Sequence, residues 1–242
     1  MANDWFDFKG DRCTAYGIRC VGLPPVTLAE ERVKFEDVAG RSGSLAMLEG
    51  EDVYEDITFS CDCIMTDPTN IAAAASWLRG AGRVTFANRP GGWHEARVIN
   101  QIEFPRIIAA NPARRFTVQF RAQPFFYLAN VQDIEITAET AQIVNPGNVF
   151  SAPLIKVYGY GDLGIELAGQ LVTLQDLDGG IALDTQLQDA MSLDGSQLMN
   201  GHMTGDFIRI PAGTSTIRWF SDDDNSGGQL DRIVIEPRWR CR

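Results

Sequence analysis

The sequence is poor in lysine and histidine and has no long apolar run. Lysine is found only at positions 9, 34 and 156, and 21 basic residues face 32 acidic ones, for a net charge of -11. Nucleic-acid binding needs clustered positive charge, so we expect no nucleic acid to be bound directly. The apolar runs are far shorter than the roughly 20 residues that span a bilayer, so we expect no membrane insertion. The first ten residues lack the layout of a signal peptide, and we expect the chain to be made in a cytoplasm.

Histidine and cysteine are too few and too scattered for a catalytic or metal-binding pattern. His94 and His202 lie near no G-x-S-x-G elbow and in no H-E-x-x-H pair, and we expect both to be structural or surface residues. Carboxylate pairs for glycoside hydrolysis stay open, because nothing selects two of the 32 acidic residues. We predict a protein that is not an enzyme, with no cofactor and no metal. We also expect buried free thiols, because metal-site spacing is missing among Cys13, Cys20, Cys61, Cys63 and Cys241.

One stretch does satisfy a cofactor-binding pattern. Residues 159–164, GYGDLG, match G-x-G-x-x-G, and Asp184 follows about twenty residues later, where a dinucleotide-binding unit has its ribose-binding carboxylate. Such a unit also needs a helix directly after the glycines. The next residues, IELAGQLVTLQ, are instead typical of a hairpin with its turn at AGQ. We therefore reject the nucleotide site and interpret the glycines as turns between strands.

An acidic cluster, SDDDNSGG, resembles the start of a calcium loop. It places Asp222, Asp224 and Ser226 two residues apart, but the twelfth position would be Ile233 instead of a bidentate Glu. We expect a solvated turn, with an improvised calcium site as the open alternative. The segments DLDGG at 176–180 and SLDG at 192–195 are likewise interpreted as turns.

The first half of the chain is typical of strands with one helix. Residues 67–82 predict the helix, with Asp67 as N-cap, Pro68 in the first position and the end at Gly80 or Gly82. Its apolar stripe is Ile71, Ala74, Ala75 and Leu78. The alternation in residues 51–65 predicts a strand with one apolar face, formed by Val53, Ile57, Phe59, Cys61 and Cys63.

A long hairpin is expected around Gly40 and Gly43. Its outer part carries charges on both faces and has too few apolar residues to fold alone. We therefore expect the hairpin to lie against a partner surface.

The second half differs from the first in pattern and in charge. From about residue 131 onward, short alternating runs are separated by turn signals at spacings of roughly 8 to 12 residues, which is typical of an antiparallel β-sandwich. Residues 1–130 carry 14 basic and 16 acidic residues, a net charge of -2, whereas residues 131–242 carry 7 and 16, a net charge of -9. We predict two domains, 1–130 and 131–242, joined by the apolar stretch QPFFYLAN, with the last strand able to return to the first domain.

The order of several motifs resembles that of the distal tail protein family of siphophages. The motifs are FDFKG, VAGRSGSL, WLRGAG followed by RVTFANRPGGWHEARV, RRFTVQFRAQPFFY, NPGNVFSAPLIKVYGYGD, IALDTQ, GDFIRIPAG and a terminal IEPRWR. Two places depart from the usual pattern: Ser42 replaces a commoner acidic residue, and Thr214 and Ser215 stand where an Asn is usual.

The resemblance implies a mainly β protein of two domains. The first would be a tail-tube-like β-sandwich or split barrel with one helix and a long hairpin, and the second a galectin-like antiparallel β-sandwich. It further implies a structural virion protein that forms a homohexameric ring at the distal end of the tail, assembled in the host cytoplasm. Its neighbours would be the tail tube protein, the tail-associated hub protein and receptor-binding or fibre proteins. The hairpin tip would contact the adjacent subunit through Gly40, Arg41, Ser42 and Gly43.

A second function class stays open for the C-terminal domain. Galectin-like sandwiches invite a carbohydrate-binding or glycan-active role at the host surface, although a fold does not establish a sugar site. The aromatic platform of such a site would be formed by Tyr158, Tyr160 and Trp219.

Overall fold

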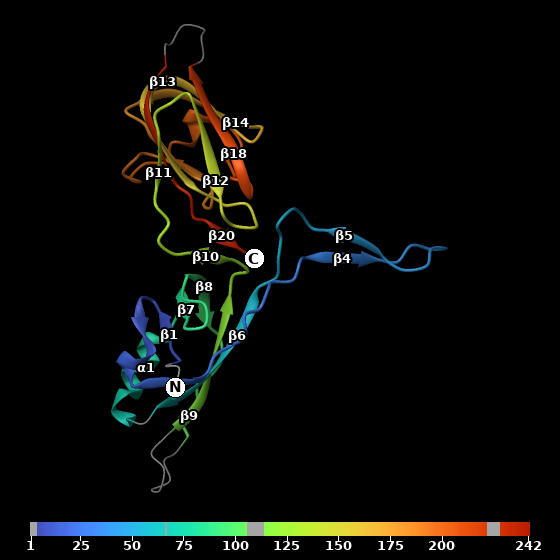
Figure 1. Cartoon of the computed structure of the whole chain (residues 1–242), viewed down its shortest axis with the longest axis vertical. Coiled ribbons are helices and arrows are strands. Elements are labelled where there is room, and N and C mark those ends of the chain that lie inside the picture. Colours follow the sequence, from blue (N-terminus) through green and yellow to red (C-terminus); the bar gives the residue numbers. More distant parts are fainter. Residues whose placement is uncertain (1–3, 66, 106–113, 222–227) are drawn as a thin grey trace. The chain divides into compact units, whose positions relative to one another are not determined.

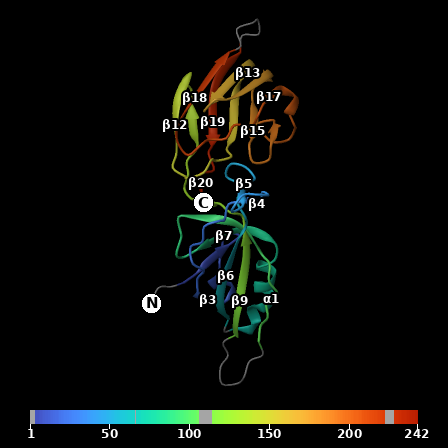
Figure 2. The same ribbon diagram turned by 90° about the vertical axis from the view of Figure 1, so that its right-hand side faces the viewer.

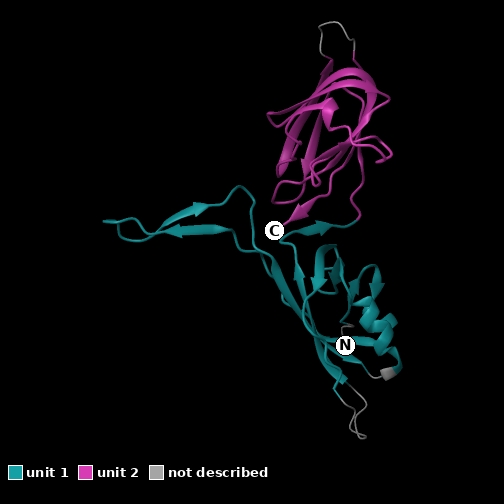
Figure 3. Cartoon of the chain, turned by 180° about the vertical axis from the view of Figure 1, so that it is seen from behind, with its two compact units in different colours: residues 1–129, 242 teal, residues 130–241 magenta. Residues whose placement is uncertain are grey.

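The computed structural model describes residues 4–65, 67–105, 114–221 and 228–242. It contains two compact units, residues 1–129 with Arg242 and residues 130–241 (Figure 3). Almost all regular structure is β, and the described residues contain one α-helix. No helix in this part of the chain is long and apolar enough to cross a membrane.

Unit 1 is built on one antiparallel sheet. The strand order is β2–β1–β7–β8–β9–β6–β3, with β10 beside β8 (Figure 1). The longest pairing joins β6 to β9 from Ile57↔Ala122 to Met65↔Arg114. The strands are β1 (Phe6–Phe8), β2 (Asp11–Arg12), β3 (Ile18–Gly22), β6 (Ile57–Met65), β7 (Ala81–Phe86), β8 (Gly92–Val98), β9 (Arg114–Ala122) and β10 (Phe126–Leu128).

The core of unit 1 follows the alternation of these strands. In β6 every second residue is buried, and the predicted apolar face of Ile57, Phe59, Cys61 and Cys63 is confirmed. Val53, which lies before the strand, is only half-buried. Aromatic rings fill the space over this face, because large side chains bury the most apolar area. They include Phe6, Phe8, Phe59, Phe86 and Phe120.

The helix α1 is shorter than predicted and faces the core differently. It spans Ile71–Trp77, after a 3-10 turn at Pro68–Asn70, and the chain turns at Gly80 before β7 begins. Asp67 does cap this segment, since its Oδ1 accepts hydrogen bonds from the Thr69 backbone N–H (2.9 Å) and hydroxyl. Trp77 replaces Ala75 in the buried stripe: its ring stacks on Phe6 with centroids 5.6 Å apart.

Residues 123–130 were predicted to be a linker, and this prediction is wrong. Phe126 and Tyr127 are buried, and the strand β10 pairs with β8 through Tyr127↔Trp93. The Trp93 and Tyr127 rings stack with centroids 6.0 Å apart. The stretch is apolar because it completes the sheet of unit 1.

Unit 2 is an antiparallel β structure centred on one strand. β13 pairs with β14, β15, β18 and β19, while β12 pairs with β18 and β11 with β19 (Figure 2). Its core consists of aliphatic side chains from alternate positions of these strands. The strands are β11 (Ile134–Ile136), β12 (Thr140–Asn145), β13 (Leu154–Leu167), β14 (Gln170–Asp178), β15 (Ile181–Asp184), β16 (Asp189–Met191), β17 (Met203–Gly205), β18 (Gly213–Ser221), β19 (Gln229–Glu236) and β20 (Arg240–Cys241).

The GYGDLG stretch lies inside β13, so its interpretation as a turn is wrong. The hairpin turn comes later, at Ala168 and Gly169, as the AGQ signal predicts. Gly161 has φ +72° beside a shift in the pairing of β13 with β14, which marks a β-bulge. Gly164 lies under the Phe220 ring, which a Cβ would approach to 2.3 Å. These glycines therefore permit a bulge and a close approach within a strand.

Candidate interaction surfaces

A two-stranded hairpin forms a sheet of its own in unit 1. It consists of β4 (Val33–Glu36) and β5 (Leu45–Leu48), and Figure 3 shows it extending away from the main sheet of the unit. At its base, the backbone of Glu31 pairs with that of Tyr54, and the Arg32 N–H donates to the Val53 carbonyl at 3.0 Å. The hairpin is thus tied to the core at one end only.

One face of this hairpin is entirely apolar, which the sequence analysis missed. The register pairs Val33 with Leu48 and Phe35 with Ala46, and cross-strand partners share a face. Phe35 is 68% exposed and Leu48 is 65% exposed. The opposite face mixes the apolar Leu45 and Met47 with an ion pair between Lys34 and Glu36. An isolated hairpin of this kind is marginally stable in water, so its apolar face needs a cover.

The predicted contact residues lie at the tip of the hairpin. Gly40, Arg41, Ser42 and Gly43 are all exposed, and the two glycines have φ values of +79° and +77°. The Arg41 N–H donates to the Val38 carbonyl at 3.1 Å, which holds the loop closed. A role for these four residues in subunit contact stays a prediction.

The three predicted platform aromatics of unit 2 do not share one face. Tyr158 and Tyr160 alternate with the buried Val157 on β13, so their side chains lie on its outer face. Trp219 is paired with Ile165, which is fully buried, so the indole lies on the inner side of the sheet. Its Nε1 donates to the Ala138 carbonyl at 3.0 Å.

The outer face keeps two tyrosines with different surroundings. Tyr160 is 51% exposed, while the Tyr158 ring lies under the Arg232 guanidinium at 4.3 Å. Phe220 joins this face over Gly164 through the pairing of β13 with β18. A sugar site at these residues stays a prediction.

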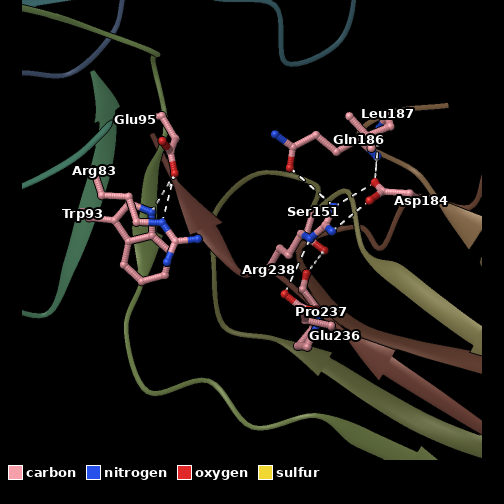
Figure 4. A network of polar contacts seen from close by, with 10 residues as sticks. All are labelled: Arg83, Trp93, Glu95, Ser151, Asp184, Gln186, Leu187, Glu236, Pro237 and Arg238. Atoms are coloured by element: carbon pink, nitrogen blue, oxygen red, sulfur yellow. Dashed lines mark hydrogen bonds and ion pairs between the residues drawn. The ribbon is translucent and has the colours of Figure 1, made fainter. Parts of the chain in front are cut away.

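An ion pair between the buried Asp184 and the half-buried Arg238 organises one end of unit 2 (Figure 4). Arg238 donates to both carboxylate oxygens of Asp184, at 2.8 and 2.9 Å, and Asp184 also accepts the backbone N–H groups of Gln186 and Leu187. Burial raises the pKa of Asp184, but these hydrogen bonds outweigh it and leave the pKa below its ordinary value. Asp184 therefore has a structural partner instead of the ribose-binding role that the glycine pattern suggested.

A smaller network lies on the surface of unit 1 (Figure 4). The Arg83 guanidinium lies 4.4 Å from the Trp93 ring, and the Glu95 carboxylate accepts from Arg83 Nε at 3.2 Å and Trp93 Nε1 at 3.3 Å. Exposed ion pairs contribute about 0–1 kcal/mol to stability, so this network orients side chains more than it stabilises the unit.

The two histidines have contrasting environments. His94 is 4% exposed and lies against Phe59 and Phe126, with ring centroids 4.9 and 5.3 Å apart. Burial, helped by the charge of Arg89, lowers the pKa of His94 to about 4. His202 lies half-buried in a 3-10 turn, Asn200–His202, with Nδ1 2.9 Å from the Gln175 carbonyl.

The cysteines are free thiols, as predicted. Cys13, Cys20, Cys61 and Cys63 are buried in unit 1, and Cys241 is half-buried. Within the described ranges, no group of three or more His, Cys, Asp or Glu residues could hold a metal ion. The turn and calcium alternatives at Asp222, Asp224 and Ser226 fall outside those ranges.

The likeness of this chain to known proteins is structural. No family model matches the sequence, and no curated protein matches it. The structure is similar to the crystal structure of the Dit protein (gp 19.1) of phage SPP1, described as a paradigm of the hub adsorption apparatus in phages that infect Gram-positive bacteria. The TM-score is 0.72 at 14% sequence identity, over 96% of this chain and 97% of that one. At this identity the likeness shows the fold, and the predicted mainly β class is confirmed.

Proposed function

We propose that the chain is a structural component of a phage tail, and that copies of it form a homohexameric ring at the distal end of the tail tube. The fold similarity to SPP1 Dit spans almost the whole chain, including both units. The sequence motifs that resemble the distal tail protein family run in the same order. No catalytic role is part of this proposal.

The observation that carries the proposal is the uncovered face of the β4–β5 hairpin. Fully burying a side chain of the size of Phe or Leu contributes about 1.5–3 kcal/mol, and Phe35 and Leu48 expose most of their surface. Covering the face would therefore stabilise the hairpin and the contact together. In a ring, every subunit offers the same hairpin and the same acceptor surface, so one type of contact is repeated until the ring closes.

The other proposed contacts follow from the position of such a ring. The tail tube protein would lie on one side of the ring, and the tail-associated hub protein and receptor-binding or fibre proteins on the other side or outside it. The acidic C-terminal half, with 7 basic and 16 acidic residues, would serve as the docking module. The protein would be a virion component at the tail tip, assembled in the host cytoplasm.

The test compares the wild-type chain with a Phe35→Glu/Leu48→Glu double variant. Light scattering after size exclusion, with negative-stain images, should show wild-type rings at high concentration and only monomers of the variant. The matched control is Val144→Glu/Leu198→Glu, which charges two exposed apolar residues of unit 2 and should leave the rings intact. Rings that survive the hairpin variant, or a wild-type chain that stays monomeric and retains bacterial polysaccharide, would contradict the proposal.

A further inference from the structure

Three thiols meet inside unit 1, beneath an edge strand of its sheet. Cys20 lies on β3, which ends the strand order of the sheet beside β6 in the described part of the chain, and Cys61 and Cys63 lie on β6. All three side chains point to the buried face, since their positions alternate with exposed residues. The proposed ring function makes no use of them.

The strand register brings Cys20 directly opposite Cys63. Residues opposite each other in an antiparallel pair have Cα atoms about 4.5 or 5.5 Å apart, depending on the hydrogen-bonding pattern. Both values lie within the range of roughly 4.4–6.8 Å that disulfides span. Cys61 is two residues along the same face of β6, and the Cys20 thiol interacts with the thiols of both Cys61 and Cys63.

The three thiols are chemically unequal. Hydrogen bonds from Cys61 and then Cys63 lower the pKa of Cys20 below its ordinary value, whereas the contact with Cys20 and burial raise the pKa of the other two. Cys20 is therefore the first to form a thiolate, which is the nucleophilic species in thiol–disulfide exchange.

A surface depression lies on the exposed side of this part of the sheet. It has a volume of about 550 Å³, and its lining includes Cys63, Val21, Asp62 and Phe116. Val21 directly follows Cys20 on the edge strand and is exposed. The thiols themselves are buried on the opposite face, so a small oxidant reaches them when the edge strand β3 opens locally, without unfolding of the central strands.

We propose that Cys20 and Cys63 form an oxidation site that closes a cross-strand disulfide and locks the edge strand β3 to β6. The proposed co-reactant is a low-molecular-weight disulfide, such as oxidised glutathione. Cys61 assists as a hydrogen-bond donor to Cys20. Cys13 and Cys241 take no part.

The reaction proceeds by two exchanges. The Cys20 thiolate attacks one sulfur of the small disulfide, forms a mixed disulfide and releases one small thiolate, which takes up a proton. Cys63 then loses its proton and attacks the Cys20 sulfur, which releases the second small thiolate. Two protein thiols are oxidised and one small disulfide is reduced to two thiols, so atoms and electrons balance.

The experiment counts thiols in the full chain. The protein is incubated with oxidised glutathione or with a reductant, quenched in acid, unfolded, alkylated and weighed by mass spectrometry. The oxidised wild type should carry two fewer alkyl groups than the reduced one, and peptide mapping should find Cys20 joined to Cys63. Because the bond ties down an edge strand, the oxidised chain should also melt at a higher temperature.

Two variants sharpen the test. Cys241→Ser changes a thiol outside the trio and should still lose two alkylation sites on oxidation. Cys20→Ala should lose none. A wild-type chain that stays fully alkylated after oxidation overturns the proposal, as does a bond that maps to Cys241 or joins two chains. If Cys20→Ala does not fold, the wild-type peptide map alone decides between these results.

Discussion

Two hairpins of the molecule have similar alternating sequences, but the apolar face of one is buried and that of the other is exposed. In β13–β14 of unit 2, the inward residues Leu163, Ile165, Val172 and Leu174 are fully buried by the rest of the unit. In β4–β5 of unit 1, the corresponding apolar residues Phe35 and Leu48 are mostly exposed. An alternating strand specifies which residues share a face, whereas the neighbouring elements determine whether that face is covered.

Truncating an apolar residue in each hairpin should show the largest contrast. Leu174→Ala should lower the free energy of unfolding by about 2–5 kcal/mol, because it opens a cavity in a packed core. Phe35→Ala should change it by less than about 0.5 kcal/mol in the monomer, because the ring is already in water. Chemical unfolding of the monomeric full chain measures both. Equal losses would mean that the hairpin face is covered within a single chain.

A buried histidine of unit 1 extends the contrast to pH. His94 has a folded pKa of about 4, below its ordinary value of about 6.5, so folding opposes its protonation. Above about pH 6.5 the imidazole is neutral in both the folded and the unfolded chain, and the stability is at its full value. As the pH falls toward 4, the unfolded chain takes up the proton first, and the free energy of unfolding decreases by about 3 kcal/mol in all. Stability measured from pH 7 to 4 should therefore fall less steeply in His94→Leu.

The ion pairs give a third comparison, between a buried pair and an exposed one. Asp184→Asn should cost about 2 kcal/mol, because it leaves the Arg238 guanidinium without its bidentate partner. Glu166→Gln breaks the exposed pair with Arg218 and should cost less than about 1 kcal/mol. Since the folded pKa of Asp184 is lowered, its contribution is present above about pH 4 and is lost as the pH falls below that. Thermal melting of the two variants measures both losses. A larger loss in Glu166→Gln than in Asp184→Asn would contradict this expectation.

The loop glycines provide the smallest and most specific contrast. Gly169 and Gly40 have nearly the same φ, +80° and +79°, and neither has an atom within 4 Å of an added Cβ. Alanine at either position meets the same backbone strain, about 1 kcal/mol. Gly169→Ala should lower the melting temperature of unit 2. Gly40→Ala should leave melting unchanged, because the β4–β5 tip can distort without opening a core. A loss of melting temperature in Gly40→Ala would show that the tip is coupled to the core.

The sequence predicted what is local and missed what depends on pairing. The turn at Ala168 and Gly169 was found because the glycine lies between two alternating runs. The prediction of a turn at GYGDLG was wrong. A glycine is equally typical of a turn, a bulge or a close approach, and only the partner strand distinguishes the three. On the helix, Ala75 and Trp77 both suit an apolar stripe, and the contact with Phe6 decides between them.

The candidate surfaces were predictable to a smaller extent. The need of the β4–β5 hairpin for a partner followed from its pattern, but its apolar face did not, since Phe35 and Leu48 come together only through a register set across an eight-residue loop, 37–44. Trp219 was grouped with Tyr158 and Tyr160 because all three alternate along strands. Which side of the sheet each one faces depends on partners far away in sequence, such as Ile165.

The central position of β13 has a consequence for how the chain is made. Its partners begin directly after it, with β14 at residue 170, and continue to β19, which ends at residue 236. During synthesis, the β13–β14 hairpin can form early, but the first half of β13 lacks one partner strand until β19 has left the ribosome. Nascent unit 2 therefore carries an open strand edge until late in translation, and pausing before residue 229 would favour aggregation of the unfinished chain.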